Sequence, residues 1–236
     1  MEKVLKQLVE RLTKTYGERL VSVVLYGSAA VGDHHGRFSD INILCVLSEL
    51  TPRELGESAT VFQWWQRMGN PPPLLFSREE VSTSTDCFPM EFLDIRERHR
   101  VLHGEDVVRD LEVDKSFYRA QVEHELRAKL LRLRQKAASA MGSKDLLARL
   151  LADSLSTFCV LFRHALLLHG AEAAFEKRGV VEQASVRFGF DPSPFRTLLD
   201  FREQKIKARD VQAVTLLELY LKQIQIVILA VDRLEK

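Results

Sequence analysis

The sequence predicts an α+β protein in which a domain with a mixed β-sheet, residues 1–113, precedes an all-helical bundle, residues 114–236. β-branched runs long enough for buried strands occur only in the first part. Beyond about Asp114 the chain changes to long amphipathic and apolar helical patterns. With 236 residues and 46% hydrophobic composition, the chain can bury a sizeable core.

The first part begins with helical spacing over residues 2–16, which Gly17 ends. Two runs, 20–26 and 41–47, have the composition of buried strands, and a polar, glycine-rich segment separates them. Further elements expected here are a helix from the capping box Thr51–Glu54 to about Gly69, a strand at 74–76, a helical turn after the capping box Ser77–Glu80, and a strand at 88–95. The charged run 96–100 is interpreted as a solvated face.

The second part contains three long helical patterns, 116–140, 145–169 and 211–234. The apolar run Ile224–Val231 suits a homodimer interface as well as an intramolecular core, so a homodimer is one expected partner.

Composition argues against several classes of protein. The formal net charge of +1 gives no support to nucleic acid as the main ligand. The three cysteines are far apart and form no C-x-x-C pair, which favours reduced, buried thiols. We found neither an apolar signal segment at the N-terminus nor a run approaching 18 uninterrupted apolar residues. We therefore expect a cytoplasmic protein that does not span a membrane.

Residues typical of a phosphate and metal site lie where the first two expected strands meet. Gly27 lets the backbone approach a phosphate closely, and Ser28 adds a hydroxyl donor. Asp40, before the second strand, can hold Mg²⁺ against those phosphates. Position 42 points to the same face of a strand as position 40, because side chains alternate with period two. A third acid on a neighbouring strand would complete a two-metal site.

The segments Leu25-Tyr-Gly-Ser28 and Ser39-Asp-Ile-Asn42, each joined to a hydrophobic strand, resemble the nucleotidyltransferase superfamily that includes polymerase β and the kanamycin nucleotidyltransferases. Met90-Glu91-Phe92 resembles the family's third acidic element. Asp94 also fits this pattern, but on a strand it would face away from Glu91. The helices after position 114 resemble, in pattern only, the bundle of the kanamycin-type enzymes.

This resemblance implies transfer of a nucleotidyl group from ATP or another nucleoside triphosphate to a hydroxyl acceptor. Gly27 and Ser28 would hold the phosphates, and Asp40, Asn42 and Glu91 would hold Mg²⁺. Asp40 and Glu91 are thus the expected catalytic residues, with Glu91 also a candidate general base.

The chain departs from the family pattern at two positions. Asn42 stands where active relatives carry a second carboxylate. An amide oxygen can bind a hard cation but brings no charge, so metal affinity should fall. Val31 stands where many relatives have arginine, and Arg37 in the same loop is the candidate substitute.

Asn42 leaves a second function open, namely a catalytically degenerate protein that binds nucleotide and regulates a partner. A third hypothesis is a helical ribonuclease with an Arg-x4–6-His motif. Three chance-level matches fit that motif, and they are Arg98…His103, Arg119…His124 and Arg163…His169.

Overall fold

The computed structural model describes residues 1–31 and 41–234. The chain divides into two compact units, Met1–Ser116 and Phe117–Lys236.

The first unit is built on a four-stranded mixed sheet with strand order β3-β2-β1-β4. The central strand β1 (Leu20–Tyr26) pairs antiparallel with β2 (Asn42–Leu47) and with β4 (His99–Gly104). β3 (Leu74–Ser77) pairs parallel with β2. The two strands expected from the β-branched runs are therefore neighbours, and the end of β1 meets the start of β2.

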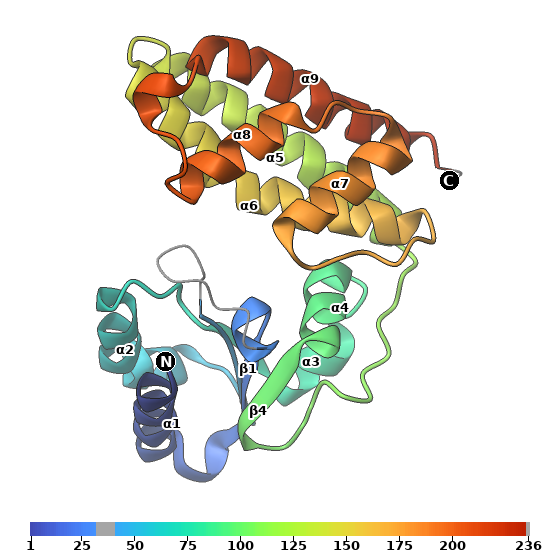
Figure 1. Cartoon of the computed structure of the whole chain (residues 1–236). Coiled ribbons are helices and arrows are strands. Elements are labelled where there is room, and N and C mark those ends of the chain that lie inside the picture. Colours follow the sequence, from blue (N-terminus) through green and yellow to red (C-terminus); the bar gives the residue numbers. More distant parts are fainter. Residues whose placement is uncertain (32–40, 235–236) are drawn as a thin grey trace. The chain divides into compact units, whose positions relative to one another are not determined.

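Helices cover both faces of this sheet (Figure 1). The helices α1 (Glu2–Tyr16) and α2 (Pro52–Arg67) lie on one side, and α3 (Arg78–Thr83) and α4 (Pro89–Glu97) lie on the other. The side chains of successive residues in each strand point to opposite faces of the sheet. On the side of α1 and α2 the core contains Leu5, Leu8, Leu12, Val23, Leu25, Ile43, Cys45 and Trp65. On the side of α4 it contains Val24, Leu44, Val46, Phe92, Ile95 and Val108.

The prediction of a strand at residues 88–95 is wrong, because this segment forms helix α4. Pro89 occupies the first turn of the helix, where its missing N–H is not needed. Phe92 and Ile95, three residues apart, pack against the sheet as neighbours on one helical face. The strand lies instead at His99–Gly104 and includes part of the charged run that was interpreted as a solvated face.

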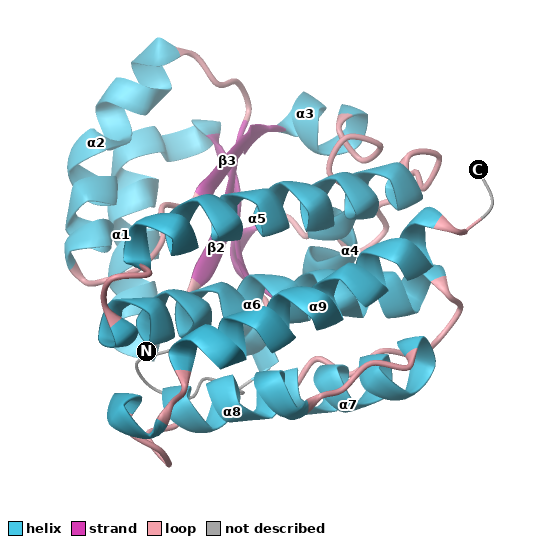
Figure 2. Cartoon of the chain, turned by 90° about the horizontal axis from the view of Figure 1, so that it is seen from above, coloured by secondary structure: helices cyan, strands magenta, loops and turns pink. Residues whose placement is uncertain are grey.

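The second unit is an all-helical bundle (Figure 2). Its helices are α5 (Tyr118–Ala140), α6 (Lys144–Leu168), α7 (Lys177–Phe188), α8 (Ser193–Arg202) and α9 (Ala213–Asp232), with a short 3₁₀ turn at Ala208–Asp210. Helix α6 contacts each of the other four helices. Phe162 of α6 packs against Phe190 and Phe195, and Phe195 in turn packs against Tyr220 of α9. These contacts make α6 the centre of the bundle.

Two helices of the bundle, α6 and α9, are long and apolar enough to cross a membrane by length and composition alone. Core helices of water-soluble proteins pass the same test, and the buried side chains of α6 include Leu147, Leu151, Leu155 and Phe162. The finding is therefore weak evidence for a membrane span.

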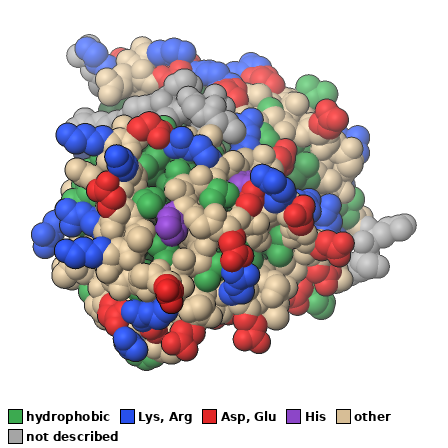
Figure 3. All heavy atoms as spheres, turned by 90° about the horizontal axis from the view of Figure 1, so that it is seen from below, with side chains coloured by type: hydrophobic (Ala, Val, Ile, Leu, Met, Phe, Trp, Pro, Cys, Tyr) green, Lys and Arg blue, Asp and Glu red, His purple; other side chains and the backbone are tan. Residues whose placement is uncertain are grey.

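Charged side chains of both signs are interspersed on the face of the molecule drawn in Figure 3. This distribution agrees with the near-neutral formal charge of +1.

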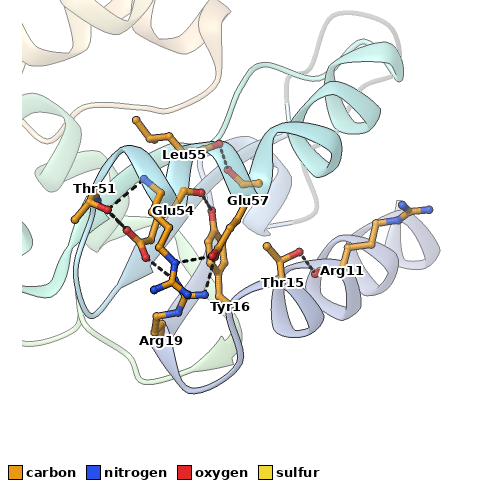
Figure 4. Close-up of polar contacts among 10 residues, drawn as sticks. Arg11, Thr15, Tyr16, Arg19, Thr51, Glu54, Leu55 and Glu57 are labelled. Atoms are coloured by element: carbon orange, nitrogen blue, oxygen red, sulfur yellow. Dashed lines mark hydrogen bonds and ion pairs between the residues drawn. The ribbon is translucent and has the colours of Figure 1, made fainter.

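A buried carboxylate fastens the start of α2 to the segment before β1 (Figure 4). Glu54 is fully buried, accepts a hydrogen bond from the backbone N–H of Thr51 at 3.1 Å, and forms an ion pair with Arg19. Arg19 also reaches Glu57 at 2.6 Å. Hydrogen bonding from the Thr51 side chain is the largest influence on the Glu54 carboxyl group. Together with the contact from Arg19 it outweighs desolvation and lowers the pKa of Glu54 to about 2.

Replacing Glu54 with glutamine should lower the melting temperature at pH 7 more than Glu57→Gln does, because only Glu54 is fully buried. The folded-state pKa of Glu54 lies below its ordinary value of 4.5, so its contribution is complete above that value and is lost as pH falls toward 2. The difference in melting temperature between wild type and Glu54→Gln should shrink over this range. Equal losses for both variants at pH 7 would contradict this assignment.

Candidate functional site

The site begins where β1 ends in a left-handed glycine. Gly27 has φ +77°, a conformation that residues with a Cβ atom rarely adopt. Its N–H donates to the carbonyl oxygen of Arg98 at 3.0 Å, and its own carbonyl accepts from the N–H of Ala30 at 3.1 Å. The second bond closes the 3₁₀ turn Ser28–Val31. The sharp turn at Gly27 is thus held from both sides.

Asn42 lies directly beside this turn. It is the register partner of Tyr26 in the antiparallel pair of β1 and β2. A Cβ atom built on Gly27 would lie 3.4 Å from Asn42 Nδ2. The structure therefore brings together Gly27 and Asn42, two of the residues singled out from the sequence. Asp40 and Arg37 lie outside the described residues, and Ser28 begins the 3₁₀ turn.

Three polar side chains form a row across the sheet at this end. Tyr26 is the partner of Asn42 on one side and of His99 on the other. Tyr26 packs with the core cluster that contains Val24 and Phe92, so its side chain is on the face covered by α4. Directly opposed residues share a face, so Asn42 and His99 lie on that face too. We call this set the Asn42–Tyr26–His99 row.

Two carboxylates of α4 contribute to a raised pKa at Tyr26, the central residue of this row. Burial, followed by the negative charges of Glu91 and then Asp94, raises the pKa of Tyr26 to about 12. The expectation that only one of the two acids can face the site rested on a strand, and the structure has helix α4 at these positions instead. On a helix, residues three apart lie about 4.5 Å apart along the axis and about 60° apart around it. Glu91 is exposed and Asp94 is half-buried.

His99 is a member of the row that the sequence pattern did not reveal. Its Nδ1 lies 3.1 Å from the carbonyl oxygen of Arg96, and its Nε2 lies 3.1 Å from Asp106 Oδ1. Both neighbours are acceptors, so both contacts are hydrogen bonds only when the ring carries two protons. Desolvation acts to raise the pKa of Asp106, but the hydrogen bond and charge of His99 outweigh it and lower the pKa.

A family model described as "Nucleotidyltransferase domain" matches residues 3–137, which is more than half of the chain. The chain belongs to the nucleotidyltransferase domain family. The match includes β1, the Gly27 turn, β2 and α4 and extends to most of α5.

Solved structures give a second comparison. The chain resembles the spectinomycin adenyltransferase AAD(9) from Enterococcus faecialis, crystallised with ATP and spectinomycin, at a TM-score of 0.63 and 11% identity. The alignment covers 98% of this chain and 99% of that one, and it shows a shared fold. The predicted α+β class, a mixed-sheet domain followed by a helical bundle, is thereby confirmed.

A toxin–antitoxin structure with AMP-PNP also matches, with 19% identity over 43% of this chain and 74% of that one. Its TM-score of 0.30 is too low to support a structural argument. No curated protein sequence matches the chain.

The donor set of this nucleotidyltransferase domain suits a hard cation. Within residues 1–31 and 41–234, no three His, Cys, Asp or Glu side chains form a metal-binding group. Of the predicted ligands, Asn42 and Glu91 lie among the described residues, and their amide and carboxylate oxygens are of the kind that Mg²⁺ prefers. Asp40 is the remaining expected ligand and lies outside the described residues.

In the helical unit, two basic residues of α6 are buried, whereas several basic side chains of α5 are exposed. Arg163 and His164 are buried, the guanidinium of Arg163 stacks 3.7 Å from the centre of the Phe175 ring, and His164 contacts the hydroxyl of Tyr118 at 2.7 Å. Three basic side chains of α5, at positions spaced by three and four residues, are exposed, and these are Lys129, Arg132 and Lys136. Two histidines of the Arg-x4–6-His matches behind the ribonuclease hypothesis lie in this unit. His124 is exposed, and the Nδ1 atom of His169 lies 2.9 Å from the carbonyl oxygen of Ala165.

Replacing Gly27 with alanine should weaken nucleotide binding as well as stability. The left-handed backbone costs about 1–2 kcal/mol for a residue with a Cβ atom, and the new methyl group would lie 3.4 Å from the Asn42 amide nitrogen. Gly17→Ala is the matched control, because Gly17 has φ +56° with open space around its Cβ position. Both variants should melt earlier, but only Gly27→Ala should lose ATP affinity in calorimetry. Unchanged ATP affinity in Gly27→Ala would place the nucleotide elsewhere.

Proposed function

We propose that this protein catalyses Mg²⁺-dependent transfer of a nucleotidyl group from ATP or another nucleoside triphosphate to a hydroxyl acceptor. One observation carries the proposal. In a member of the nucleotidyltransferase domain family, the glycine turn after β1 lies against Asn42 at the start of β2, on the sheet face where two carboxylates of α4 act.

The residues take the following roles in this proposal. The Gly27–Ser28 turn offers backbone N–H groups to the β- and γ-phosphates, with Arg37 as a further phosphate contact. Asp40, Asn42 and Glu91 bind Mg²⁺, which would neutralise phosphate charge as the leaving group departs. Glu91, which is exposed, takes the proton from the acceptor hydroxyl.

The proposed reaction is an in-line displacement at the α-phosphorus of the nucleoside triphosphate. The acceptor oxygen forms a bond to the α-phosphorus while the bond from that phosphorus to pyrophosphate breaks, and the proton passes to Glu91. Since no covalent enzyme intermediate is needed, positioning and charge neutralisation supply most of the rate.

The adenyltransferase of similar fold was crystallised with ATP, which supports a nucleoside triphosphate as the donor. That protein's second ligand, spectinomycin, makes a hydroxyl-bearing small molecule the first class of acceptor to test. The formal charge of +1 gives a long nucleic acid acceptor no support.

The second candidate function is nucleotide binding without transfer. Asn42 favours it, since the amide brings no charge to the cation where a carboxylate would bring one.

Titration with ATP and Mg²⁺, followed by pyrophosphate detection with a panel of hydroxyl-bearing acceptors, separates the two functions. The proposal expects Mg²⁺-dependent ATP binding with pyrophosphate release, and Asp40→Ala should abolish both. Asn42→Asp adds a charge beside the cation and should tighten metal binding at least about tenfold, which corresponds to 1.4 kcal/mol. ATP binding without release across the panel favours the binding protein. If wild type binds no ATP, both functions fail.

A further inference from the structure

We propose that the groove between α5 and α6, at the end where these two helices are joined, binds an acidic amphipathic helix of a partner protein. The groove lies entirely within the second unit. Binding there would not depend on the proposed transfer reaction. Three features of this end of the bundle point to such a partner, namely a cavity, exposed apolar side chains and a concentration of basic side chains.

The groove lies where the last turns of α5 meet the first turns of α6, two helices that pack side by side (Figure 2). Its volume of about 370 Å³ is within the range of roughly 300–1,000 Å³ that is usual for binding pockets. The residues that line it are Gln135, Lys136, Ser139, Ala140, Leu146 and Leu150. Leu146 and Leu150 are one helical turn apart, so they present one apolar surface of α6 to the groove.

Apolar side chains are exposed at this end of the bundle. Leu146 is 55% exposed, and Met141, directly after α5, is 48% exposed. The neighbouring leucines of α6, Leu147 and Leu151, are fully buried and fill the core. Leu146 is therefore not needed for the core of the bundle. Exposed apolar side chains that gather beside a groove are typical of an interaction surface.

The same segment is strongly basic. Between residues 130 and 150 the sequence has one acidic residue, Asp145. It has five basic residues in this span, all of them exposed, and they are Arg132, Arg134, Lys136, Lys144 and Arg149. Because the whole chain has a formal net charge of only +1, positive charge is concentrated at this end of the helix pair.

These five basic residues differ from other cations of the unit in their partners. Arg119, Arg178 and Arg196 form ion pairs with carboxylates at 2.8, 2.7 and 2.5 Å. Among the residues that the structure describes, none of the five forms an ion pair. A single surface cation without a carboxylate beside it is ordinary, but here several of them surround an apolar groove.

Positive charge lies on both sides of the groove. Lys136 lines it, and Arg132 is one helical turn earlier on the same face of α5. On α6, Arg149 is three residues after Leu146 and is therefore its neighbour on the helix surface. The apolar surface of the groove is thus flanked by a cation of each helix.

An acidic amphipathic helix matches both the shape and the charge of this surface. Its apolar face would enter the groove, and carboxylates beside that face would meet the flanking cations in charge-assisted hydrogen bonds. A nucleic acid would match the charge but has no apolar side chain for the groove. A lipid surface would also match the charge, but it is flat and would leave the hollow between the helices unfilled.

Fluorescence anisotropy of a labelled synthetic peptide, titrated with the full chain, tests the proposal. The peptide has leucines at i, i+3, i+4 and i+7 and glutamates at the flanking positions, and a second peptide has lysine in place of every glutamate. The glutamate peptide should bind at least about tenfold more tightly than the lysine peptide. The double variant Arg132→Glu/Lys136→Glu should reverse this preference.

Matched variants separate binding in the groove from general electrostatic attraction. Lys3→Glu/Lys6→Glu makes the same change of charge at two exposed lysines of α1 and should bind like wild type. Leu146→Ser should weaken binding of the glutamate peptide at least about fivefold, because apolar contact is lost. Val186→Ser, at a residue of α7 that is 86% exposed, should have no effect. Since Leu146 is more than half exposed, the variant should fold and melt like wild type.

Four results would overturn the proposal. One is equal affinity for the two peptides, and another is an equal loss in the α1 control. A third is unchanged affinity in Leu146→Ser, since charge alone would then attract the peptide. The fourth is that neither peptide binds while phosphatidylserine vesicles or single-stranded RNA bind through Arg132 and Lys136, or that sedimentation shows a dimer which Leu146→Ser dissociates. The groove would then belong to a lipid, a nucleic acid or a second copy of the chain.

Discussion

The antiparallel pairing of β1 with β2 is the constraint on which the site depends. It sets Tyr26 opposite Asn42, and it brings the turn at Gly27 against the Asn42 amide. Both faces of these strands are buried, by α1 and α2 on one side and by α4 on the other. A register slip of one residue would send every buried side chain to the opposite face, so core packing fixes the register and thereby fixes the site.

Helix α4 is the second part of the arrangement, and it depends on the first. Its anchors Phe92 and Ile95 find their places only because Val24 and Leu44 present an apolar surface on that face. The end of α4 in turn holds the glycine turn in place, because the carbonyl oxygen of Arg98, the residue after the helix, accepts a hydrogen bond from the N–H of Gly27. The turn and the acids are therefore positioned by one core rather than by loops that adjust independently.

Much of this was predictable from sequence. The runs 20–26 and 41–47 are β-branched and bounded by turn residues, and both capping boxes have reciprocal bonds that short sequence patterns specify. The helix at 89–97 was not predictable in the same way. Its core residues include Met90, Phe92, Leu93 and Ile95, and so short an apolar run fits a buried strand as well as a helix.

Strand β4 was missed for a related reason. It is an edge strand with a partly exposed pattern, and its charged residues conceal the alternation that marks a strand. His99 belongs to the row only because β4 pairs with β1, which is a tertiary contact that local sequence does not encode. In contrast, Gly27 and Asn42 were found because each lies at the end of a strand with a strong local signal.

The secondary structure around positions 91–94 decides how the amide at position 42 should be interpreted. If the acids were on a strand, one would point away, and the loss of a carboxylate at position 42 would leave a single described charge for a cation. On a helix, positions 91 and 94 lie about 60° apart around the axis, so neither acid is directed to the face opposite the other. An amide oxygen can itself bind a hard cation, so the uncharged residue at position 42, opposite Tyr26 in the sheet, does not by itself indicate a degenerate site.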